Sequence, residues 1–104
     1  MTNEPDTTIV TMELDAADLG ALLAVLAKYV VVARGQPGCR NIDLCRSVVS
    51  DHRVVVISKW SSPAAQQTHF DSPETVEMAQ ACTGILLRPP RIELWEGISA
   101  HDLA

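Results

Sequence analysis

Four consecutive β-branched residues, Val54-Val55-Val56-Ile57, constrain the fold of this chain more than any other stretch. Successive side chains of a strand point to opposite faces, so a strand with one wet face alternates apolar and polar residues. This segment has no such alternation and predicts a strand that is covered on both faces. The core of a 104-residue chain is small, so a second copy of the chain is the simplest cover for one of those faces.

Turn and breaker residues divide the chain into four strands and two helices, in the order β-α-β-β-α-β. The expected strands are residues 7–14, 39–49, 53–60 and 91–97. This order is typical of the ferredoxin-like split βαβ fold, an α+β architecture in which an antiparallel sheet carries both helices on one face. We expect one domain over residues 1–104, with an ordered core at about 7–98 between polar tails. The uncovered sheet face predicts a homodimer.

The helices are marked by their capping residues. Asp15 or Asp18 could cap the first helix, whose apolar stripe continues in phase through the β-rich YVVVA segment to a stop near Gly35. A Ser-Pro pair at residues 62–63 starts the second helix. The segment DSPE at 71–74 interrupts this helix, and its aspartate and glutamate have the spacing of a capping box. The restarted helix is expected to end near residue 83.

Charge and composition exclude several classes of partner. The net charge is −5, and the eight Lys and Arg residues are scattered singly, so no basic patch is available for nucleic acid or an anionic membrane. No apolar run approaches the roughly 20 residues that span a bilayer, and the first residues, MTNEPDTT, do not resemble a signal peptide. We therefore expect a soluble, cytoplasmic protein.

The three cysteines, Cys39, Cys45 and Cys82, are an odd set without CxxC spacing, and we interpret them as small buried apolar residues. No metal-binding motif, Gly-rich phosphate loop or nucleophile elbow is visible. We predict no metal and no bound cofactor.

His69 is the only histidine inside a predicted helix, and Trp60 ends the apolar strand below that helix. A pocket between helix and sheet could present the imidazole to an aromatic substrate. The alternative is that His69 is a surface or capping residue. Asn41 and Ser58 are candidate hydrogen-bonding groups for a ligand, although buried polar groups with internal partners would look the same in sequence. Trp95 is expected in the core.

Several stretches resemble the antibiotic biosynthesis monooxygenase (ABM) family. They are the loop QPGC at residues 36–39, the hairpin that ends in Trp60, and WSSPAAQQTH at 60–69 followed by DSP at 71–73. The resemblance covers about residues 7–98. It implies a dimeric α+β barrel that is built from split βαβ protomers.

The resemblance also implies a cofactor-independent monooxygenase that oxidises a small quinol- or anthrone-like substrate with dioxygen. His69 would be the base or anion partner, and Trp60 would form a wall of the pocket. Asn41 and Ser58 would be weaker hydrogen-bonding residues.

Three positions depart from the family pattern: Ser58 replaces the usual Glu, Ile42 a frequent aromatic residue, and Glu74 a later His. A non-catalytic small-molecule-binding module and a small-metabolite isomerase therefore stay open as alternatives. Haem degradation is disfavoured, because Met78 stands where an axial His is needed and the first strand has no Asn.

Overall fold

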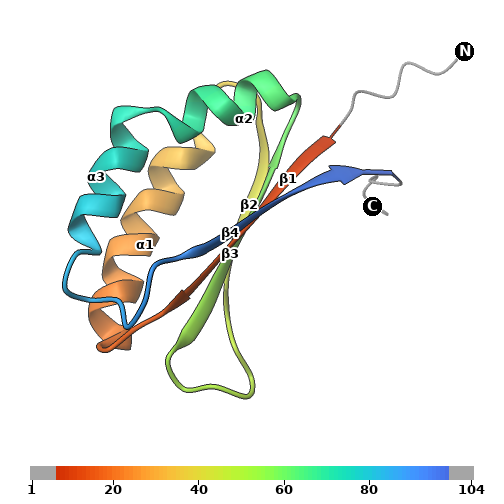
Figure 1. Cartoon of the computed structure of the whole chain (residues 1–104). Helices are drawn as coiled ribbons and strands as arrows, with labels where there is room; N and C mark the ends of the chain where they lie inside the picture. Colours follow the sequence, from red (N-terminus) through yellow and green to blue (C-terminus); the bar gives the residue numbers. More distant parts are fainter. Residues whose placement is uncertain (1–6, 99–104) are drawn as a thin grey trace, which may run out of the picture.

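The computed structural model describes residues 7–98 and has the predicted order of elements, with the second helix divided in two (Figure 1). The strands are β1 (Thr7–Asp15), β2 (Cys39–Arg46), β3 (Arg53–Trp60) and β4 (Arg91–Gly97), and the helices are α1 (Leu19–Arg34), α2 (Pro63–Phe70) and α3 (Pro73–Ala81). The strands form one antiparallel sheet in the order β2-β3-β1-β4, and the helices lie on one of its faces. The expected α+β ferredoxin-like fold is confirmed. The predicted polar tails, with His101, lie outside the described residues.

Capping side chains decide where the helices begin. Asp18 caps α1, and its carboxylate accepts the backbone N–H of Ala21. The expected cap of the restarted helix is wrong: Ser72 caps α3 by accepting the N–H of Thr75, whereas Asp71 ends α2. None of the helices within residues 7–98 is long and apolar enough to cross a membrane.

The helices cover one of the two faces of strand β3, and the cover expected on its other face stays a prediction. Val54 and Val56 are buried beneath the helices, and Val55 and Ile57 lie on the opposite, open face of the sheet. Trp95 of β4 also lies on the open face and is 52% exposed, so the expectation that it packs in the core of the protomer is wrong.

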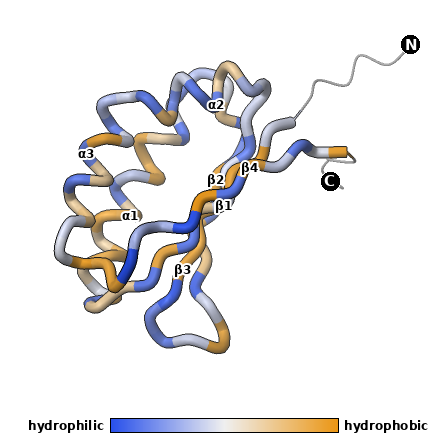
Figure 2. The backbone as a smooth tube through the Cα atoms, in the orientation of Figure 1, coloured by the Kyte–Doolittle hydropathy of each residue, from blue (hydrophilic) through white to orange (hydrophobic). Residues whose placement is uncertain are grey.

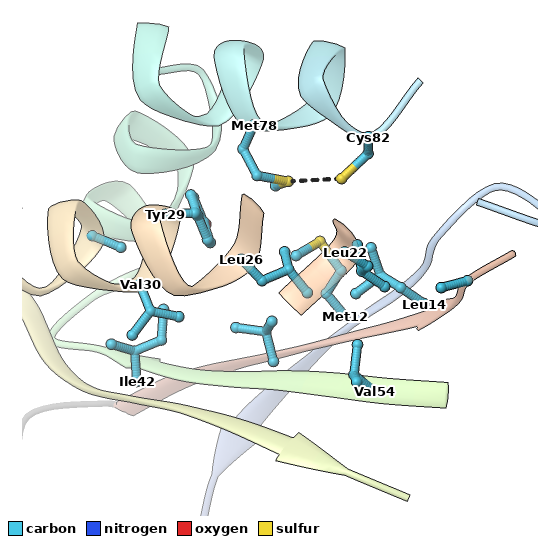
Figure 3. Packing of buried hydrophobic residues seen from close by; sticks show 13 residues of the cluster. Met12, Leu14, Leu22, Leu26, Tyr29, Val30, Ile42, Val54, Met78 and Cys82 are labelled. Atoms are coloured by element: carbon cyan, nitrogen blue, oxygen red, sulfur yellow. Dashed lines mark hydrogen bonds between the residues drawn. The ribbon is translucent and has the colours of Figure 1, made fainter. Parts of the chain in front are cut away.

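The core fills the space between the sheet and the helices (Figure 3). Met78 and Cys82 point from the α3 side toward α1 and the sheet in this view, and Cys82 is buried as expected. The same cluster contains the large apolar side chains of Met12, Leu14, Leu22, Leu26, Tyr29, Val30, Ile42, Val54 and Val56.

A β-bulge decides which side chains of β2 face the helices. The register with β3 shifts between Cys39 and Asn41, so that Arg40 is an extra residue on β2. An extra residue turns every later side chain to the other face of the sheet. Ile42 therefore points to the helices and is fully buried, whereas Asn41 lies on the open face. Cys45 shares the open face and is exposed, so its predicted burial is wrong.

Strand β2 ends at Arg46 rather than at residue 49, because Ser47 starts a turn. The Ser47 hydroxyl accepts the backbone N–H groups of Val49 and Ser50, which removes this segment from the ladder. Val48 and Val49 are 98% and 89% exposed. Figure 2 shows this short apolar stretch in the connection between β2 and β3, away from the helices.

Candidate functional site

His69 lies near the end of α2 and is buried, with 6% of its surface exposed. Its ring stacks on that of Trp60, with 4.5 Å between ring centroids and 23° between ring planes. Its Nε2 atom is 2.6 Å from the hydroxyl oxygen of Tyr29, which comes from α1. The alternative that His69 is a surface or capping residue is therefore wrong.

The position of α2, and with it His69, depends on Gly38 in the QPGC loop. Gly38 has a φ of 82°, and its carbonyl accepts the backbone N–H of Ser61 just before α2. A Cβ atom on Gly38 would lie 2.5 Å from the Cβ of Ala65. The left-handed φ and the close approach both require glycine here.

Trp60 and Ser58 lie on the helix face of β3 and are buried with His69. The indole N–H of Trp60 donates to the Ser58 hydroxyl at 3.0 Å. Ser58 therefore helps to orient the Trp60 ring by accepting this bond. These three predicted residues meet in one place.

Asn41 does not join them. The bulge in β2 places it on the opposite face of the sheet, where its amide donates to Asp43 at 3.0 Å. The expectation that Asn41 lines the same pocket as His69 is therefore wrong, because no sequence signal marked the extra residue that reverses its direction.

Two residues of the site, Tyr29 and Thr75, were not identified from the sequence. Thr75 lies in the first turn of α3, and its hydroxyl donates to the carbonyl oxygen of His69 at 2.8 Å. This bond joins the start of α3 to the end of α2. Tyr29 shares the buried side of α1 with Leu22 and Leu26, and a tyrosine within an apolar helical stripe signals that its hydroxyl has a polar partner.

Burial sets the protonation of the central pair. Burial lowers the pKa of His69, although the charge of Glu74 opposes this effect, so the ring is neutral at pH 7. Burial raises the pKa of Tyr29, so its phenol keeps its proton. The Nδ1 atom of His69 is buried and has no hydrogen-bond partner within the described residues.

His69 borders a cavity of about 30 Å³, which is room for one or two water molecules. A larger cavity of about 440 Å³ adjoins it between α3, the α3–β4 connection and the sheet. Both cavities share walls formed by Met12, Phe70, Thr75, Met78 and Ile92. The larger volume is within the range of small-molecule sites, and most of its lining is apolar.

One charged residue, Arg88, lines the larger cavity within residues 7–98. Arg88 and Arg53 bind the carboxylate of Asp15 at 3.2 and 2.8 Å. The bond to Arg53 lowers the pKa of Asp15. The backbone N–H of Leu87 donates to the Asp15 carbonyl at 2.8 Å, so the α3–β4 connection is fastened to the end of β1. These contacts hold the outer wall of the cavity in place.

Within the described part of the chain, no group of three or more His, Cys, Asp or Glu side chains could hold a metal ion. The side chains gathered around His69 offer a neutral imidazole, a phenol and an apolar cavity.

The family model for antibiotic biosynthesis monooxygenases matches residues 7–81. No curated protein matches the sequence. A solved protein of unknown function from Nitrosomonas europaea superposes with a TM-score of 0.85 at 19% identity, over 98% of this chain and 99% of that one. A Caulobacter crescentus protein that bears the family's name gives a TM-score of 0.83 at 19% identity, over 92% and 93%. A second such protein, from Nitrosomonas europaea, gives 0.82 at 11% identity, over 95% and 96%. At these identities the solved structures establish the fold.

Proposed function

Because the chain belongs to the antibiotic biosynthesis monooxygenase family, we propose that it is a cofactor-independent monooxygenase that oxidises a small quinol- or anthrone-like substrate with dioxygen. The observation that carries this proposal is the neutral, buried imidazole of His69, which lies between Tyr29 and Trp60 beside an apolar cavity. Such a reaction needs a water-poor site and a group that binds the substrate anion, and the apolar cavity and the His69 imidazole support assigning these roles here.

The proposed reaction balances without an external reductant. In an anthrone-like substrate, the two C–H bonds of a methylene between aromatic rings are replaced by one C=O bond. One oxygen atom of O₂ enters that carbonyl, and the other leaves as water with the two hydrogens. All four electrons come from the substrate. The protein contributes by holding the substrate anion and excluding water.

The substrate is proposed to occupy the 440 Å³ cavity with its reacting end toward His69. The side chains between the two cavities must move before a substrate in the larger cavity can contact His69. Met12 and Met78 are two of these side chains, and methionine side chains are flexible enough to repack around a ligand. Trp60 would then form the floor of the combined pocket.

Oxygen uptake by the purified protein tests this proposal, with dithranol, a dihydroxylated anthrone, as the substrate. The expected result is uptake with release of the quinone product, both lost in His69→Ala. His52→Ala is the matched control, since His52 lies exposed in the β2–β3 turn. No uptake above the spontaneous rate in the wild-type protein would refute the enzyme proposal.

A non-catalytic binding module is the second candidate, and the engagement of Ser58 by the Trp60 indole favours it. Where the family usually carries a glutamate, this chain has a hydroxyl that is already bonded to a neighbour. Saturable binding of dithranol without oxygen uptake would support this candidate over the enzyme.

We also propose that the chain forms a homodimer through the open sheet face. Ile9, Val55, Ile57 and Trp95 place apolar surface on this face, beyond the reach of the helices. Removing such surface from water is worth about 25 cal/mol per Å². Sedimentation velocity at micromolar concentration should give the mass of two chains, and a monomer would overturn the proposal.

A further inference from the structure

The distance between the Tyr29 hydroxyl and the His69 ring favours the tyrosine as the donor of the hydrogen. The tyrosine oxygen is 2.6 Å from Nε2, whereas N–H···O bonds are usually about 2.7–3.2 Å long and O–H donors come closer. The raised pKa of Tyr29 also keeps the hydrogen on its oxygen. The short distance therefore favours Tyr29 as the donor and the lone pair of Nε2 as the acceptor.

Thr75 does not replace Tyr29 in this role. Its hydroxyl hydrogen is used on the carbonyl oxygen of His69 at 2.8 Å, and its oxygen is 3.4 Å from Nε2. The Ser72 hydroxyl lies 3.2 Å from the hydroxyl oxygen of Thr75 and makes no hydrogen bond to the His69 ring. The Thr75 hydrogen is therefore not available to Nε2, which leaves Tyr29 as the hydroxyl that can donate to its lone pair.

A neutral imidazole carries one ring hydrogen, and when Nε2 is an acceptor that hydrogen is on Nδ1. Nδ1 of His69 is buried without a partner within residues 7–98. Buried N–H groups without acceptors are rare in folded proteins, because desolvating a donor without a replacement bond is costly. The ring that carries this donor borders the 30 Å³ cavity, which has room for a small acceptor.

We propose that Tyr29 is a positioning residue that holds His69 in the Nδ1–H tautomer, and that this N–H donates to a phenolate or enolate oxygen of the substrate. The inference rests on the proposed function and narrows it. His69 is then the anion partner rather than the base, since its only free ring atom already carries a hydrogen. The substrates that fit are phenols or enols acidic enough to ionise in water before they bind.

The tautomer is tested without any ligand, by the ¹⁵N chemical shifts of the His69 ring in the labelled full-length chain. We expect a protonated Nδ1 and an accepting Nε2 at pH 7. Tyr29→Phe keeps the ring and removes the hydroxyl, and should move the ring toward the Nε2–H form. A wild-type Nε2–H ring, or a spectrum unchanged in Tyr29→Phe, overturns the positioning role.

The oxyanion site is tested with 4-nitrophenol, whose phenolate and phenol forms have different absorption spectra. The protein should bind the phenolate and lower the apparent pKa of the bound probe. A hydrogen bond to a charged group corresponds to about a tenfold to hundredfold preference for the anion. Failure of the phenolate to bind, or equal affinity for both forms, overturns the site.

Two substitutions of His69 separate its ring nitrogens. The amide nitrogen of Asn is as many bonds from Cα as Nδ1, and that of Gln as many as Nε2. His69→Asn should therefore retain part of the phenolate preference, whereas His69→Gln should lose it about tenfold or more. The reverse order would overturn the assignment to Nδ1. Circular dichroism of both variants checks that they are folded.

The two proposals fail separately. Phenolate binding and the Nδ1–H ring without oxygen uptake would refute the monooxygenase and leave this inference standing. Oxygen uptake in a protein whose His69 is in the Nε2–H form would support the monooxygenase and refute the inference about Tyr29 and Nδ1.

Discussion

Replacing Gly38 by alanine should destabilise the protein by more than its backbone conformation alone explains. Gly38 has a φ of 82°, and the added methyl group would lie 2.5 Å from the Ala65 Cβ and 2.9 Å from the Ser61 hydroxyl. The left-handed conformation costs a non-glycine residue about 1–2 kcal/mol, and the lower entropy of the unfolded chain offsets about 0.4–1 kcal/mol of this. Forcing atoms into a packed site adds about 1–3 kcal/mol.

Gly84 provides the matched control. Its φ is 83°, but a Cβ atom there would meet nothing within 4 Å. Gly84→Ala should therefore cost only the conformational part, about 0.5–1.5 kcal/mol, and Gly38→Ala about 2–4 kcal/mol.

Urea denaturation followed by circular dichroism measures both values, at one protein concentration because association affects apparent stability. The difference between the two variants isolates the contact with α2. Equal losses of stability in Gly38→Ala and Gly84→Ala would show that α2 moves away freely, and would refute the claim that this contact fixes the position of His69.

Three further predictions concern the site and the sheet. Burial lowers the pKa of His69 below its ordinary value near 6.5, so the neutral ring contributes fully to stability above about pH 6.5, and this contribution is lost as the pH falls through the lowered pKa. Urea denaturation between pH 7 and 5 should therefore show a smaller loss of unfolding free energy in His69→Gln than in the wild-type protein. Equal losses in the two proteins would contradict this. Met78→Ala should lower the free energy of unfolding by about 2–5 kcal/mol in the same assay. The substitution also joins the two cavities, so dithranol should bind more tightly in a fluorescence titration. Unchanged binding would show that Met78 does not keep the ligand away from His69. Ile57→Lys places a charge on the open sheet face and should give monomers in sedimentation velocity, whereas a dimer that persists would place the interface elsewhere.

The elements of this fold could be predicted because their signals are local. The uninterrupted β-branched run of β3 indicated a strand, and the in-phase apolar stripe of α1 outweighed the β-propensity of YVVVA. The predicted end of β2 was less accurate. The Ser47 side chain ends the strand through hydrogen bonds that the spacing of apolar residues does not reveal.

The site could be predicted only in part. His69 and Trp60 could be named because the segment around the Ser-Pro start of α2 resembles the family. The direction of Asn41 depends on one extra residue, Arg40, in a strand that otherwise looks regular. Tyr29 is 40 residues from His69 in sequence, and their bond exists only after α1 packs beside α2 and α3. A contact at that separation is a property of the assembled core.

The strand order has a consequence for how the chain is made. β1 lies in the interior of the sheet, yet its neighbour β4 is the last of the described strands to be synthesised, and Thr7 pairs with Gly97. During translation β1 can gain β3 on one side, but the N–H and C=O groups along its other side stay open until β4 leaves the ribosome. A nascent chain of this kind presents an unpaired strand that other chains can bind, so its solubility in the cell depends on how quickly the final strand arrives.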